Sequence, residues 1–138
     1  MRKLILVVVL LAGLIPFPQK VAPSCTVLTV NGAGTPQAGI RVREIWQQYS
    51  LETKGHEEDI DTGASGLVAF PQRTIWRPYL ANVLGACRNA LGQGVHASFG
   101  AHAYLIAWGN GTEAFAGQIG GTESAPQRMV LDPAQGAR

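Results

Sequence analysis

Short strand-like segments separated by turns rich in glycine and proline are the feature that most limits how this chain can fold. Residues 26–30 are mostly β-branched and precede a turn cluster at residues 31–36. Residues 67–70 are typical of a buried strand between the glycine-containing turn at 63–66 and Pro71. With 17 Gly and 8 Pro in 138 residues, a helical bundle is disfavoured. Strands at this spacing, without intervening amphipathic helices, predict an all-β sandwich.

Alternation of apolar and polar residues indicates where other strands lie. Ile40, Val42 and Trp46 share one face of a strand, and the polar residues 55–62 form another candidate. Glu44 and Ile45 interrupt the alternation, which predicts a bulge or an edge position at that point.

The second half of the chain has one clear hairpin signal. Residues 96–108 alternate, and Asn110-Gly111 is a strong turn dipeptide, so residues 113–119 are expected to pair back on that strand. Residues 127–131 are a further strand candidate. Residues 78–94 have no clean period and fit a strand, a loop or a short helix.

The N-terminus has the pattern of an export signal. Arg2 and Lys3 precede twelve apolar residues, 4–15. As a helix these cover about 18 Å, short of the roughly 30 Å hydrocarbon core of a bilayer. The pattern predicts a signal peptide over residues 1–24, a sandwich domain over 25–131 and a loose tail over 132–138. An uncleaved anchor or a buried apolar strand is the alternative. We therefore expect a secreted or periplasmic protein without a transmembrane segment after signal removal.

The charge balance argues against binding to nucleic acid. The chain has 11 basic and 9 acidic residues, a net charge of +2. Three of the basic residues and none of the acidic ones precede Cys25, so signal removal leaves eight basic and nine acidic residues. A domain with a net charge near −1 is not a typical polyanion binder.

Cys25 and Cys87 are the two cysteines of the chain. In an oxidising compartment, an even pair predicts one disulfide, between Cys25 and Cys87. Cys25 as the lipid-anchored first residue of a bacterial lipoprotein is a second option, although Ala22 stands where that motif usually has Leu. Two free thiols are the third.

The segment from residue 26 to residue 76 resembles a known module. A strand at 26–30, a Gly/Pro turn at 34–39, a strand at 40–46 and the turn Asp61-Thr62-Gly63-Ala64-Ser65-Gly66 before residues 67–70 follow its order. This order resembles the carboxypeptidase regulatory-like modules, although Gly63 replaces the Asp of that family's turn. The resemblance implies an antiparallel Greek-key β-sandwich of about seven strands, transthyretin-like, and says little about function.

Catalytic and metal-binding patterns are weak. None of the serines lies in a Gly-x-Ser-x-Gly elbow. His96 and His102 are six residues apart, about 20 Å along a strand, so one metal ion cannot take both. A metal-assisted hydrolase built on His56, His96 or His102 is the least favoured hypothesis. Acidic residues 57–61 are expected to form a solvated strand or loop, with a calcium site as the alternative. We expect no cofactor and no metal.

The leading hypothesis is a secreted, non-enzymatic binding or structural module. Its partner is an unidentified protein or a cell-envelope glycan. Among the aromatic residues, Trp76 and Tyr79 lie in a polar setting. Trp76 stands between Arg73 and Pro78, and Tyr79 directly follows Pro78. The second hypothesis is a carbohydrate- or envelope-binding domain that uses Trp76 and Tyr79 as a stacking platform.

Overall fold

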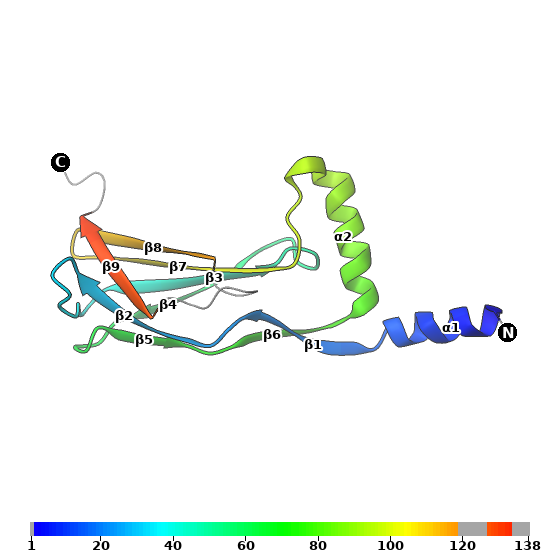
Figure 1. Cartoon of the computed structure of the whole chain (residues 1–138), viewed down its shortest axis with the longest axis horizontal. Helices are drawn as coiled ribbons and strands as arrows, with labels where there is room; N and C mark the ends of the chain where they lie inside the picture. The colour runs from blue at the N-terminus through cyan, green and yellow to red at the C-terminus, as the bar shows by residue number, and fades with distance from the viewer. Residues whose placement is uncertain (1, 119–126, 134–138) are drawn as a thin grey trace.

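The computed structural model describes residues 2–118 and 127–133, and this part of the chain is mostly β (Figure 1). The predicted all-β class is confirmed. The strands are β1 (Pro16–Ala22), β2 (Cys25–Asn31), β3 (Arg41–Gln48), β4 (His56–Asp61), β5 (Leu67–Phe70), β6 (Arg73–Pro78), β7 (Ala101–Gly109), β8 (Thr112–Gln118) and β9 (Arg128–Pro133). The helices are α1 (Arg2–Gly13), α2 (Tyr79–Gln93) and a 3₁₀ turn, η1 (Gly94–His96).

The main sheet folds over on itself. Its strand order is β4-β3-β7-β8-β9-β2-β5, and β8 meets β9 only through Thr112–Pro133 and Glu113–Asp132. This short contact lets β9-β2-β5 lie opposite β4-β3-β7-β8. The core fills the space between the two layers, with Val27 and Phe70 from one side and Val42 and Leu105 from the other, each at most 2% exposed.

Local predictions hold best where turns and alternation agree. The Asn110-Gly111 hairpin joins β7 to β8, and both residues have the positive φ angles, 51° and 71°, that this tight turn requires. Ala103, Leu105 and Ala107 form the buried face of β7, as the alternation predicts.

Three features of the sheet differ from the expectations. The pairing is not wholly antiparallel, because β2 runs parallel to β9. Nine strands are described rather than about seven, since β1 and β6 add a two-stranded ribbon. The predicted bulge or edge position at Glu44 is wrong, because β3 pairs in unbroken register with β4 on one side and β7 on the other, and Glu44 points inward like Val42.

The ribbon of β1 and β6 continues the β2–β5 pair toward one end of the molecule. Val21 and Ala22 at the end of β1 are 2% and 0% exposed. Residues 16–22, which the sequence places in the signal segment, are therefore paired and partly buried in this structure.

Two helices mark the same end of the molecule. α2 stands across the end of the main sheet, and α1 projects beyond it without a buried residue (Figure 1). Within the described residues, neither helix is long and apolar enough to span a bilayer.

Candidate functional site

Helix α2 carries its apolar side chains on its outward face. Leu80, Val83, Leu84, Cys87 and Leu91 follow helical spacing and share one side, which we call the outward stripe. Val83, Leu84 and Leu91 are 44%, 61% and 89% exposed. A stripe that would normally pack on a core therefore faces away from the protein.

The polar side of α2 faces the protein instead. Asn82 Nδ2 donates a hydrogen bond to Gln19 Oε1 at 2.8 Å, and Asn89 Nδ2 donates to the carbonyl of Tyr49. Asn89 is the buried residue of this helix. This orientation reverses the usual amphipathic arrangement of a surface helix.

The reversed orientation explains why the sequence does not distinguish a strand, a loop and a short helix over residues 78–94. The outward stripe has the right spacing, but apart from Arg88 the residues between its members are Asn, Ala and Gly rather than charged groups. Leu84 and Leu91 are thus candidate binding residues that sequence reasoning missed. The 3.6-residue period of the five apolar residues was the available signal.

Trp76 and Tyr79, the predicted binding residues, lie at this same end and are 65% and 62% exposed. The Tyr79 ring lies 6.3 Å from that of Phe17, measured between centroids. Trp76 pairs with Pro18 and Phe17 with Arg77, so alternation puts Trp76 and Phe17 on opposite faces of the ribbon. The two predicted residues therefore flank the ribbon and do not form one continuous platform.

A basic hollow adjoins the outward stripe. A cavity of about 360 Å³ is lined by Arg77, Arg88 and Leu84 together with Ser50 and Leu51. Across residues 2–118 and 127–133, neither arginine forms an ion pair. Two guanidinium groups beside an exposed leucine give the hollow a positive, half-apolar character.

Charge is segregated along the chain. Neither residues 1–43 nor residues 62–112 contain an Asp or a Glu. The basic residues of α1, β1, β6 and α2 are Arg2, Lys3, Lys20, Arg73, Arg77 and Arg88. Arg73 is paired with Glu44 and Glu58, but the other five give this end a positive charge that the small net charge of the chain conceals.

A buried ion cluster lies where the ribbon meets the main sheet. Arg73 donates to Glu44 Oε2 at 2.7 Å and also to Glu58, while its guanidinium lies 4.3 Å from the centre of the Trp46 ring. Glu44 is fully buried, and its Oε1 has no hydrogen-bond partner among the described residues. Burial raises the pKa of the Glu44 carboxyl, and Arg73 offsets part of that rise. The cluster ties the start of β6 to β3 and β4.

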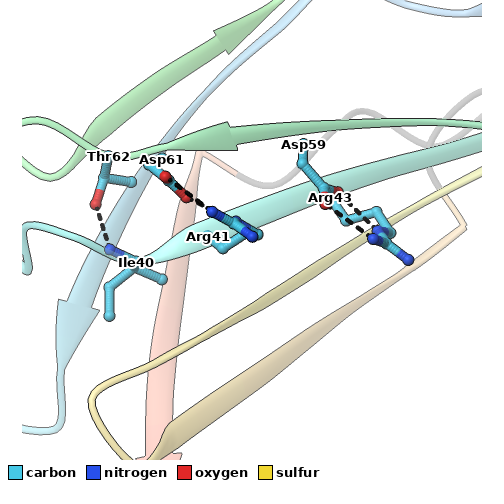
Figure 2. A network of polar contacts seen from close by, with 6 residues as sticks. All are labelled: Ile40, Arg41, Arg43, Asp59, Asp61 and Thr62. Atoms are coloured by element: carbon cyan, nitrogen blue, oxygen red, sulfur yellow. Dashed lines mark hydrogen bonds and ion pairs between the residues drawn. The ribbon is translucent and has the colours of Figure 1, made fainter.

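The acidic residues of β4 are held by arginines of β3. Arg41 Nε lies 2.9 Å from Asp61 Oδ1, and Arg43 Nε lies 2.7 Å from Asp59 Oδ1. Figure 2 shows the two pairs side by side along β3 and β4. Hydrogen bonds from these arginines lower the pKa of both aspartates. Arg43 also pairs with Glu57, and Glu58 pairs with Arg73, so each carboxylate that the sequence offered as a calcium site faces an arginine.

The histidines are engaged separately. His56 stacks on Trp46 and binds Glu52 Oε1 at 2.9 Å, whereas His102 contacts the Phe99 carbonyl at 2.9 Å. His96 lies in η1, and its side chain is outside the described part of the structure. Among the residues described, no three His, Cys, Asp or Glu side chains are grouped to hold a metal ion.

The predicted disulfide is not formed. Cys25 is buried at the start of β2, opposite Phe70, whereas Cys87 is exposed on α2, and both are free thiols. Burial, followed by the nearby Glu44 charge, raises the pKa of the Cys25 thiol. The sequence could not separate this outcome from a bridge, because pairing depends on where the fold puts each sulfur.

Comparison of the chain with protein-family models gives no match, and comparison with curated proteins gives none either.

Proposed function

We propose that this chain is an exported, non-enzymatic binding module of the cell envelope. The proposal includes a transthyretin-type Greek-key sandwich of the carboxypeptidase regulatory-like kind as its framework. The order β2, glycine-rich turn, β3, β4, turn and β5 supports that framework.

The observation that carries the proposal is the concentration of exposed apolar and aromatic side chains at the end formed by the ribbon and α2. Trp76, Tyr79 and the outward stripe all lie there. Apolar side chains gathered in this way, outside the core, are typical of a binding surface. The sandwich supplies a rigid support, and the polar clusters described above stabilise it.

A cell-envelope glycan is the second candidate partner. The 65% exposure of Trp76 favours it, since an open indole face can stack on a sugar ring. In that case Trp76 and Tyr79 each bind a sugar ring separately. Tyr79 lies beside Phe17, and Phe17 and Trp76 lie on opposite faces of the ribbon.

Co-sedimentation of the full chain with isolated envelope fractions tests the proposal. We expect Trp76→Ala combined with Tyr79→Ala to weaken binding about tenfold or more, the usual effect of losing hot-spot aromatics. Phe115→Ala is the matched control, because Phe115 is 67% exposed but lies on β8. Equal binding by the double variant and the control would refute the proposal.

A further inference from the structure

The apolar side chains of the outward stripe of α2 are left largely uncovered by the described part of the protein. Its leucines are exposed, while asparagines on the other side of the helix anchor it to the sandwich. α1 reaches the stripe only at Leu80 and leaves Val83, Leu84 and Leu91 exposed. The helix is therefore fixed with its apolar face outward.

The charges around the stripe favour an anionic partner. Arg77 and Arg88 line one hollow next to Leu84, and β1, β6 and α2 contain no acidic residue. Glu52, in the loop beside Ser50 and Leu51, is already bound by His56 and by the backbone N–H of Gln48.

Aromatic and apolar groups border this basic surface. Tyr79 lies beside Phe17, on the face of the ribbon that carries Arg77, and combines an apolar ring with a polar edge, a property that suits the boundary between lipid and water. α1 adds an exposed apolar helix whose end is close to the stripe, since a Cβ on Gly13 would lie 3.7 Å from Leu80 Cβ. A helix with an apolar face, next to cationic groups and aromatic rings, is typical of binding in the plane of a membrane.

From these observations we infer that the α2 end of the molecule docks on an anionic lipid bilayer. The outward stripe enters the interfacial layer, and Arg77 and Arg88 bind lipid phosphates. This inference rests on the proposed envelope-binding function and names its partner.

Vesicle co-sedimentation of the full chain tests the inference. The probes are vesicles of phosphatidylglycerol mixed with phosphatidylcholine, and vesicles of phosphatidylcholine alone. We expect Arg77→Gln with Arg88→Gln to weaken binding to the anionic vesicles about 30-fold, the effect of two basic residues at an anionic surface. Arg41→Gln with Arg128→Gln removes the same charge from β3 and β9, and binding is expected to stay within about twofold of the unchanged chain.

A second variant tests the apolar part of the surface. Leu84→Ser with Leu91→Ser leaves the charge unchanged, and both side chains are exposed, so folding is expected to persist. We expect the Leu84/Leu91 double variant to weaken vesicle binding as well.

Three outcomes overturn the inference. The first is an equal loss of vesicle binding in the Arg77/Arg88 and the Arg41/Arg128 double variants, which would mean that binding depends on net charge alone. The second is unchanged vesicle binding in both the Arg77/Arg88 and the Leu84/Leu91 double variants, which would mean that α1 binds the vesicles. The third is binding to envelope glycan without binding to vesicles, which leaves the proposed function standing and refutes only the lipid partner.

Discussion

At the scale of single residues, Glu44 shows how a charged side chain is accommodated at an inward position of a strand. It occupies the same face of β3 as Val42, where an apolar residue is expected, and Arg73 brings the compensating charge from β6. Burial still dominates its titration, so the pKa of Glu44 is raised. Since one carboxylate oxygen has no hydrogen-bond partner within residues 2–118 and 127–133, the cluster stabilises the charged form incompletely.

The raised pKa of Glu44 gives a stability effect with a definite sign. The folded state holds the Glu44 proton more tightly than the unfolded state, whose carboxyl titrates near pH 4.3. The contribution of Glu44 to the free energy of unfolding is therefore largest below about pH 4.3 and is lost as pH rises through the folded pKa. We expect the unchanged chain to lose stability relative to Glu44→Gln between pH 4 and pH 7, measured by urea unfolding.

The comparison with Glu44→Gln isolates this carboxyl. Asp59 and Asp61 have lowered pKa values, so their contribution is present above the unfolded pKa and is lost as pH falls through the folded pKa. Both proteins share that contribution, and it cancels in the difference. A difference that grows in favour of the unchanged chain as pH rises would show that the attraction of Arg73 outweighs burial.

At the scale of elements, the position of α2 depends on a close approach of backbone to backbone. Gly85 lies against the carbonyl of Ser50, and a Cβ at Gly85 would overlap that group. Gly92, on the same helix, has open space around the position of a Cβ. The two glycines thus have different roles in one helix.

Substitution of these glycines tests the docking of α2. We expect Gly85→Ala to lower the free energy of unfolding by about 1–3 kcal/mol, because the helix must shift to admit the methyl group. Gly92→Ala should raise it by about 0.5–1 kcal/mol, because alanine favours a helix interior. Urea unfolding of both variants measures the difference, and stabilisation by both would mean that α2 does not pack on Ser50 in solution.

The elements also show how far the sequence predicts this fold. β5 and the β7–β8 hairpin were predictable because alternation and turn residues are local signals. β1 was not predicted, since Pro16 and Pro18 argue against a strand and its partner lies more than fifty residues away. For the candidate site, exposed aromatics pointed to Trp76 and Tyr79, but the reversal of α2 depends on tertiary contacts.

At the scale of the whole molecule, the β1–β6 ribbon links the N-terminal segment to the main sheet and to α2. β6 pairs with β1 as a ribbon distinct from the main sheet, and α2 follows β6 directly. Any change that removes β1 therefore acts on the strand that leads into α2. The predicted boundary at Cys25 falls after this strand, so the extent of the folded unit is open to a direct test.

Chains shortened at the N-terminus distinguish a domain that begins at Pro16 from one that begins at Cys25. We expect a chain that starts at Pro16 to unfold in urea like the full chain, because α1 contributes no buried residue. A chain that starts at Cys25 loses the β1–β6 pairing together with buried Val21 and Ala22. Burial of one valine contributes about 1.5–3 kcal/mol, so we expect a loss of at least about 2 kcal/mol. Equal stability of the two shortened chains would place the domain boundary at Cys25, because β1 would then be dispensable for folding.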